Sequence, residues 1–308
     1  MNLDSAVFGI MESIDREQYV VALYYMEAES KDLHKKVESI AFEQSTGTWV
    51  CVPEETCEIR EKYAAKVLFV HEIPDYEDAL PADTSVRKCI FAIGFPAINI
   101  NGQIPQVLTA AYGNISMSGK LKLLDIFFPK SFVSRYKGPK FGIEGIRKLL
   151  GMEERPLMVA MFKPCIGMKP KTLGGILFEM GAGGIDVIKD DELLADPEFC
   201  TVEDRLEECM KSVKRVYSET GRRVLYALNI TDNFDKMFKK AKWAVKHGAN
   251  CIMVNAFTVS HAAMSALAED PEINVPILCH PDFAGAYFGS PYYGLTSSLV
   301  LGKLARLS

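Results

Sequence analysis

The stretch RVLYALNITDNFDKMFKKAKWAVKHGANCIMVNAF, residues 223–257, decides the fold class. Residues 223–230 and 251–257 are short apolar runs that predict strands, and the spacing between them predicts a helix over 234–249. The two strands are apolar almost throughout, which is typical of parallel strands covered by helices on both faces. The stretch therefore predicts one strand–helix–strand unit of a parallel α/β sheet.

The same alternation continues on both sides of this unit. We expect further strands at PLMVAMFKP (156–164), IDVIKDDE (185–192) and VPILCH (275–280), each followed by a helix, which makes about five strand–helix units. Two architectures fit this pattern, an open doubly wound sheet and a (β/α)8 barrel. The turn FKPCIGMKPK (162–171) lacks the GxGxxG motif of dinucleotide-binding sheets, and polar residues follow five of the strands, so the barrel is favoured.

Five strands do not close a barrel of eight. Two strand edges would lack hydrogen-bond partners, so either the sheet is open or the barrel is truncated.

The first part of the chain has a different pattern. Apolar and β-branched runs predict strands, and helical spacing predicts two helices, without a repeating unit. The expected strands are 18–28, 64–73, 87–96 and 120–129, and the expected helices are 31–42 and 105–113. The stretch SRYKGPKFG (134–142) is a plausible boundary. We therefore expect an N-terminal α+β domain over 1–137 and a barrel domain over 138–308 whose C-terminal part is missing.

Composition and charge exclude several classes of function. The chain has 308 residues, 48% hydrophobic and 24% charged, with a net charge of −5. This charge gives no reason to expect a nucleic-acid partner. No apolar run approaches the roughly 18–20 residues that span a membrane. Residues 1–18 do not resemble a signal peptide, so we expect a cytoplasmic protein without a membrane partner.

The eight cysteines are scattered and form no CxxC pair, and the five histidines do not flank cysteines at ligand spacing. We expect reduced thiols rather than a disulfide framework or a zinc site.

The stretch GGIDVIKDDELL (183–194) places one lysine among three acids at the end of a predicted strand. Lys189 and Asp191 point to the same face of a strand, and Glu192 can turn in beside them. One reading is an ion pair at the strand end. In the other reading, Lys189 takes up carbon dioxide as a carbamate, and three anionic groups then offer the oxygen ligands that Mg²⁺ prefers.

Several motifs resemble the RuBisCO large-chain superfamily. GGIDVIKDDE resembles its metal-site motif, FEQSTGTW (42–49) and LTAAYGN (108–114) resemble its N-terminal-domain motifs, and FKPCIG (162–167) resembles its first-strand motif. The motifs occur in order over nearly the whole chain. The resemblance implies a ferredoxin-like α+β domain followed by a (β/α)8 TIM-type barrel, here truncated after about five strand–helix units.

The resemblance also implies the site residues. Lys189 as carbamate, Asp191 and Glu192 would hold Mg²⁺. Substrate contacts would come from Glu43, Thr48, Trp49, Asn114 and His280. Because the first three of these reach into a neighbouring subunit's site in the family, the resemblance implies a homodimer with shared active sites.

The sequence departs from the carboxylases of this superfamily at two places. Cys165 stands where they carry a second lysine, and Asp282 and Phe283 stand where a histidine–arginine pair is expected. An aspartate would repel the second phosphate of a bisphosphate. Carboxylation of ribulose bisphosphate is therefore disfavoured.

Residues 280–306 instead resemble the RuBisCO-like proteins, near the methionine-salvage enolases that act on 2,3-diketo-5-methylthiopentyl-1-phosphate. SMSGK (116–120) resembles the segment with their proposed base, here Lys120, and Lys163 would polarise the enolate oxygen. The resemblance thus implies Mg²⁺-dependent enolisation of a small phosphorylated substrate. A base at Lys120 needs a lowered pKa. The alternatives are a carboxylase and a non-catalytic, truncated RuBisCO-like protein.

Overall fold

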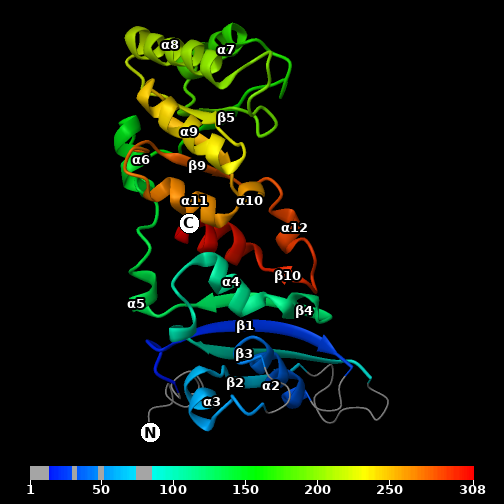
Figure 1. The fold of residues 1–308 in the computed structure, drawn as a ribbon. Coiled ribbons are helices and arrows are strands. Elements are labelled where there is room, and N and C mark those ends of the chain that lie inside the picture. The colour runs from blue at the N-terminus through cyan, green and yellow to red at the C-terminus, as the bar shows by residue number, and fades with distance from the viewer. Residues whose placement is uncertain (1–13, 30–32, 48–51, 74–84) are drawn as a thin grey trace. The chain divides into compact units, whose positions relative to one another are not determined.

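The computed structural model describes residues 14–29, 33–47, 52–73 and 85–308 (Figure 1). The chain divides into two compact units. The first contains Met1–Tyr136 and Ala284–Leu307, and the second contains Lys137–Phe283 with Ser308. The sequence analysis assigned everything after residue 137 to the barrel domain. In the structure, Ala284–Leu307 joins the first unit because its short strand pairs with that unit's sheet.

The first unit is built on a five-stranded sheet with the order β10-β4-β1-β3-β2. Its strands are β1 (Tyr19–Ala28), β2 (Lys66–Glu72), β3 (Arg87–Pro96), β4 (Lys120–Phe127) and β10 (Gly294–Leu295). Neighbouring strands are antiparallel except β10 and β4, which are parallel. The helical segments are α2 (Leu33–Glu43), α3 (Cys57–Tyr63), η1 (Ala97–Asn99), α4 (Ile104–Tyr112), η2 (Asn114–Met117), α5 (Lys130–Val133), α12 (Gly285–Phe288), the π-helical η3 (Ser298–Leu304) and α13 (Ala305–Leu307).

The core of the first unit lies around β1 and β3, which pair along their whole length from Tyr19↔Pro96 to Ala28↔Arg87. Tyr24 and Phe91 are fully buried and stack with ring centroids 4.9 Å apart. The Tyr24 hydroxyl donates to the carbonyl of Ala111, 2.5 Å away, so the end of α4 is tied to the centre of the sheet.

The second unit contains a parallel sheet with the order β5-β6-β7-β8-β9. Its strands are β5 (Val159–Met161), β6 (Val187–Lys189), β7 (Leu225–Asn229), β8 (Cys251–Asn255) and β9 (Ile277–His280). Its helices are α6 (Gly142–Leu150), α7 (Pro170–Ala182), α8 (Val202–Thr220), α9 (Phe234–Lys246), α10 (Ala256–Val259) and α11 (His261–Glu269). The predicted parallel strand–helix architecture is confirmed, since the five strands form a curled half-barrel whose edges are β5 and β9.

Side-chain alternation gives this sheet two apolar faces. Val187, Ala227 and Met253 point to one side and form a cluster with Leu150 of α6. Lys189 lies two residues after Val187 and shares that side. Asp190 points the other way, where it meets Arg205 of α8. The register of β6 therefore sends the acids after this strand to two different environments.

Helix limits follow local chemistry. The Thr201 hydroxyl accepts from the backbone N–H of Asp204 at 3.2 Å and so begins α8, and Gly221, with φ of 71°, ends it.

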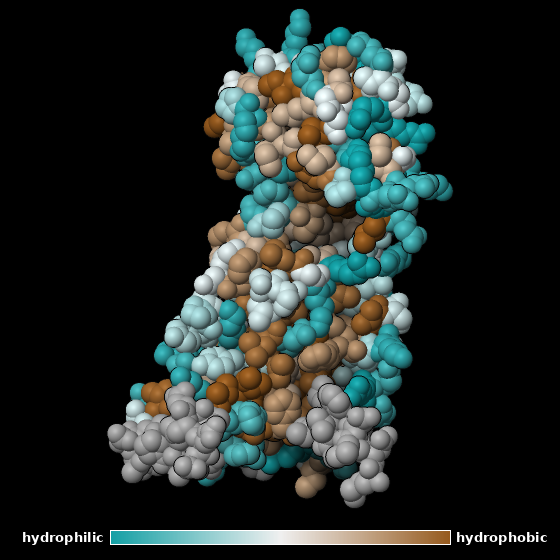
Figure 2. Space-filling model, turned by 180° about the vertical axis from the view of Figure 1, so that it is seen from behind, coloured by the Kyte–Doolittle hydropathy of each residue, from teal (hydrophilic) through white to brown (hydrophobic). Residues whose placement is uncertain are grey.

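In the described part of the chain, no helix combines the length and apolar character needed to cross a membrane. Figure 2 shows that hydrophobic residues reach the surface of one face among hydrophilic ones.

Candidate active site

Lys189 lies at the carboxyl end of β6 and is only 6% exposed. Its Nζ donates to Glu192 Oε2 at 3.1 Å and to the carbonyl of Asp190 at 3.0 Å. The pKa of Glu192 is lowered, first by its own backbone N–H and then by Lys189. The ion pair that the sequence offered as one reading of this motif is therefore present in the unmodified chain.

Lys163 follows β5 and pairs with the second acid of the motif. Its Nζ lies 2.7 Å from Asp191 Oδ2 and 3.0 Å from Cys165 Sγ. Asp191, followed by Cys165, raises the pKa of Lys163. Burial alone would raise the pKa of Asp191, but the hydrogen bond from Lys163 leaves it lowered. At neutral pH, Lys163 is therefore an ammonium and a hydrogen-bond donor.

His280 ends β9 and faces the same group. Its Nε2 lies 3.3 Å from Glu192 Oε2. The backbone N–H of Asp282 donates to its Nδ1 at 3.2 Å, so Nδ1 is an acceptor and the proton of the neutral ring resides on Nε2. The Nε2 edge of the imidazole therefore faces the Glu192 carboxylate.

Two asparagines hold the backbone after β6. Asn229 Nδ2 donates to the carbonyls of Asp191 and Glu192, both at 3.3 Å, and Asn255 Nδ2 donates to the carbonyl of Glu192 at 3.0 Å. The Oδ1 of Asn255 is buried and has no hydrogen-bond partner within the described residues. An acceptor of this kind suits a water or hydroxyl donor.

Asp190, Arg205 and Tyr226 form a buried network that the sequence analysis missed. The Asp190 carboxylate accepts from Arg205 Nε at 2.9 Å and from the Tyr226 hydroxyl at 2.7 Å. A signal was present in the sequence, because Arg205 falls between Val202 and Cys209 on the apolar stripe of a predicted helix. An arginine on such a stripe needs a buried partner.

The side chains of Lys189, Asp191 and Glu192 fit a hard cation such as Mg²⁺ only when Lys189 carries a carbamate. Over the residues that the structure describes, no three His, Cys, Asp or Glu side chains are grouped as a metal site. The two carboxylates, Asp191 and Glu192, are each neutralised by a lysine. A carbamate on Lys189 would reverse its charge and supply a third anionic group, whose oxygens are the type of ligand that Mg²⁺ prefers.

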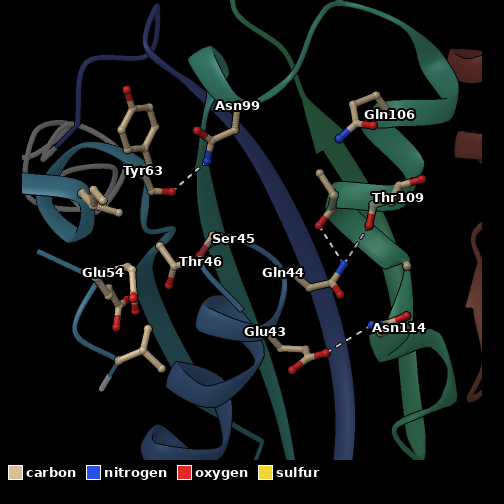
Figure 3. Close-up of a pocket in the computed structure, with 15 residues that line it drawn as sticks. Glu43, Gln44, Ser45, Thr46, Glu54, Tyr63, Asn99, Gln106, Thr109 and Asn114 are labelled. Carbon is tan, nitrogen blue, oxygen red and sulfur yellow. Dashed lines mark hydrogen bonds between the residues drawn. The ribbon is translucent and has the colours of Figure 1, made fainter. Parts of the chain in front are cut away.

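In the first unit, Glu43 and Asn114 lie together. Asn114 Nδ2 donates to Glu43 Oε1 at 3.2 Å, and Gln44 Nε2 donates to the carbonyls of Thr109 and Ala110, both at 2.9 Å (Figure 3). These residues line a cavity of about 630 Å³ between α2, α3 and α4. Among the described residues, its lining includes the acids Glu43, Glu54 and Glu55 and no lysine or arginine. The predicted site residues Thr48 and Trp49 lie outside the described residues.

Lys120 begins β4 in the first unit. Its Nζ donates to Glu27 Oε2 at 2.8 Å and lies 4.7 Å from the centroid of the Tyr292 ring. The hydrogen bond from Lys120 to Glu27 raises the pKa of Lys120. This is opposite to the lowered pKa that a base at this position needs, so the described environment disfavours the free amine.

Two family profiles match this chain. The profile described as "Ribulose bisphosphate carboxylase large chain, catalytic domain" matches residues 142–308, and the profile for the N-terminal domain of the same chain matches residues 11–132. The chain belongs to the RuBisCO large-chain family. The family that the motifs predicted is therefore confirmed.

Individual members of the RuBisCO large-chain family are also similar to this chain in sequence. It is 46% identical to a ribulose bisphosphate carboxylase-like protein of Archaeoglobus fulgidus, over 97% of this chain and 69% of the relative. It is 37% identical to a 2,3-diketo-5-methylthiopentyl-1-phosphate enolase of Geobacillus kaustophilus, over 94% of this chain and 70% of the relative.

Solved structures of proteins in this family are similar to the chain as well. A rubisco-like protein of Alicyclobacillus acidocaldarius superposes with a TM-score of 0.86 at 33% identity, over 94% of this chain and 71% of that one. A dimeric archaeal Rubisco of Hyperthermus butylicus superposes with a TM-score of 0.84 at 30% identity, over 97% of this chain and 69% of that one.

Proposed function

We propose that this chain catalyses the Mg²⁺-dependent enolisation of a small phosphorylated diketone, 2,3-diketo-5-methylthiopentyl-1-phosphate. One observation carries the proposal. Lys163, Lys189, Asp191, Glu192 and His280 gather at the carboxyl ends of β5, β6 and β9, which is the face where barrel enzymes bind substrates. The relative named as an enolase of this compound supports the choice of substrate.

Lys189, Asp191 and Glu192 would hold the cation once Lys189 carries a carbamate. The unprotonated Nζ attacks the carbon of carbon dioxide and an N–C bond forms. One C–O π bond becomes a lone pair of the new carboxylate, and the nitrogen loses a proton to solvent. Bound Mg²⁺ would stabilise the negative charge that develops on the substrate oxygen when the neighbouring carbon is deprotonated.

Two lysines of the chain would then handle the proton and the charge of the substrate. Lys163 stays protonated beside Asp191 and can donate a hydrogen bond to the enolate oxygen. We propose Lys120 of a partner subunit as the base, with Glu43, Thr48, Trp49 and Asn114 as substrate contacts from the same unit. The geometry gives less support to carboxylation, because Cys165 adds no second charge beside Lys163.

The decisive experiment follows the absorbance of the enol product with purified protein, Mg²⁺ and bicarbonate. We expect Lys189→Ala and Lys189→Arg both to lose at least about 100-fold in rate. Arginine keeps the positive charge but forms no carbamate, so it separates the carbamate from the ion pair. Lys239→Ala, an exposed lysine of α9, serves as the control. An inactive wild-type chain would contradict the proposed reaction.

We also propose that the active form is a homodimer. A solved relative is described as dimeric, and the family resemblance implies that part of each site comes from a neighbouring subunit. Light scattering coupled to size exclusion should give twice the chain mass of 34.3 kDa. A monomer at micromolar concentration that still turns over substrate would contradict the shared site.

A further inference from the structure

Asp190 lies between two residues of the candidate cation site but takes no part in it. Its side chain is fully buried on the helix side of the sheet. Three donors surround its carboxylate: Arg205 Nε at 2.9 Å, the Tyr226 hydroxyl at 2.7 Å and the backbone N–H of Asn229 at 2.8 Å. Asp190 is therefore fixed from two elements, α8 and β7.

Arg205 extends the same network to the loop after β6. Its side chain is also fully buried. Nη1 donates to the carbonyl of Cys200 at 2.7 Å, and Nη2 donates to the carbonyls of Ala195 at 2.7 Å and Asn229 at 3.3 Å. One guanidinium thus ties together the end of β6, both ends of the loop 195–200 and the end of β7.

This geometry is more than stability requires. Apolar side chains of similar volume often replace a buried ion pair without loss of stability. A planar guanidinium that bonds to four fixed acceptors defines position in a way that apolar packing does not. Because Lys189 and Asp191 flank Asp190 in the chain, a shift of Asp190 moves both.

We propose that Arg205, acting through Asp190, is a positioning residue that fixes Lys189, Asp191 and Glu192 for carbamate formation and cation binding. This inference rests on the proposed function. Arg205 touches neither substrate nor cation. Its effect is to hold the backbone from which the ligands project, as outer partners do at metal sites.

The test measures the carbamate and not turnover. Protein is incubated with ¹³C-labelled bicarbonate and increasing Mg²⁺, and the carbamate carbon is followed by NMR. Two variants are compared with the wild type: Arg205→Lys, which keeps the charge but loses the planar fork, and the double variant Asp190→Asn with Arg205→Met, which removes both charges. Arg215→Lys, on an exposed turn of the same helix, is the control.

We expect both variants to keep a wild-type melting temperature to within a few degrees, whereas the Mg²⁺ midpoint of the carbamate signal rises at least about 10-fold. The control should leave both quantities unchanged. A wild-type Mg²⁺ midpoint in a folded variant overturns the positioning role alone. Loss of folding in both variants assigns Arg205 a purely structural role and also overturns it. A wild-type chain without any carbamate signal overturns the proposed function as well.

Discussion

At the scale of single residues, the two candidate catalytic lysines share one property. Lys120 and Lys163 are each hydrogen-bonded to a carboxylate, and each has a raised pKa as a result. For Lys163 this suits a cation that keeps its proton and donates a hydrogen bond. For Lys120 it opposes the role of base, since only the unprotonated amine can accept a proton. The partner of Lys120 is therefore the residue to change.

Glu27→Gln tests this at Lys120. Because the hydrogen bond from Lys120 to Glu27 raises the pKa of Lys120, its removal should lower that pKa. If Lys120 is the base, the rising limb of kcat/KM against pH should move to lower pH. Glu27→Asp, which keeps the charge, should move it less. A profile that does not change in Glu27→Gln would exclude Lys120 as the titrating base.

Candidate residues of the second unit's site were easier to propose from the sequence than their partners. Lys189, Asp191 and Glu192 were proposed from strand alternation together with the resemblance to the family's metal-site motif, and both of these signals are local in the sequence. Arg205 and Tyr226 were missed, because their role depends on how α8 and β7 pack on the far side of that strand. Long-range packing of this kind leaves only an indirect signal, here an arginine on an apolar stripe.

At the scale of elements, α7 and α8 approach so closely that glycine is required. A Cβ added at Gly181 would lie 2.9 Å from Val216 Cγ2 and 3.2 Å from Val224 Cγ2. A valine methyl group is rigid, so the neighbouring helix would have to move. Gly175 of the same helix is exposed and has no atom within 4 Å of an added Cβ.

These two glycines make a matched pair. Gly181→Ala should lower the free energy of unfolding by about 1–2 kcal/mol, because overpacking outweighs the gain in helix propensity. Gly175→Ala should raise it by about 0.5–1 kcal/mol. Urea denaturation followed by circular dichroism measures both. Stabilisation by Gly181→Ala would mean that the two helices are not in tight contact.

Most elements were predictable, because the local spacing of apolar residues indicates buried strands and amphipathic helices. The helices α3 and α6 were not predicted, and the segment 284–307 was expected to belong to the barrel domain. Its residues predict a helix but do not say which sheet the preceding β10 joins. That choice depends on hydrogen bonds such as the one from Thr296 Oγ1 to the carbonyl of Leu124 at 2.6 Å.

At the scale of the whole molecule, carboxylates in both units have lowered pKa values. Asp186 is buried and accepts two hydrogen bonds from Arg155, at 2.6 and 2.7 Å, which lower its pKa. The pKa of Glu72 is lowered in the same way by hydrogen bonds from Arg87. Asp190 is the exception, since burial raises its pKa against the opposing effect of Arg205. The carboxylates with lowered pKa values predominate.

The pH dependence of stability follows from these directions. A carboxylate with a folded pKa below its unfolded value of about 4 binds more protons in the unfolded chain. Its contribution is therefore complete above that unfolded pKa and is lost as pH falls through the folded pKa. We expect the urea midpoint to fall steeply from about pH 5 to pH 3.

Asp186→Asn tests one local part of this effect. The variant should be less stable at pH 7 by about 1–3 kcal/mol, and the difference from the wild type should shrink toward pH 3. Glu154→Gln is the control, since the described residues show no ion pair for this exposed carboxylate. A difference that is constant with pH would show that Asp186 acts through packing and not through its charge.

The return of the chain to the first unit has a consequence for biosynthesis. The edge of β4 remains without its β10 partner until Gly294 and Leu295 have been translated. At about 5–20 residues per second, this is a delay of roughly ten to thirty seconds after β4 itself. The nascent second unit can complete its sheet during that interval. The first unit is therefore the first to be translated, but it receives the last strand of its sheet only after all five strands of the second unit have been made.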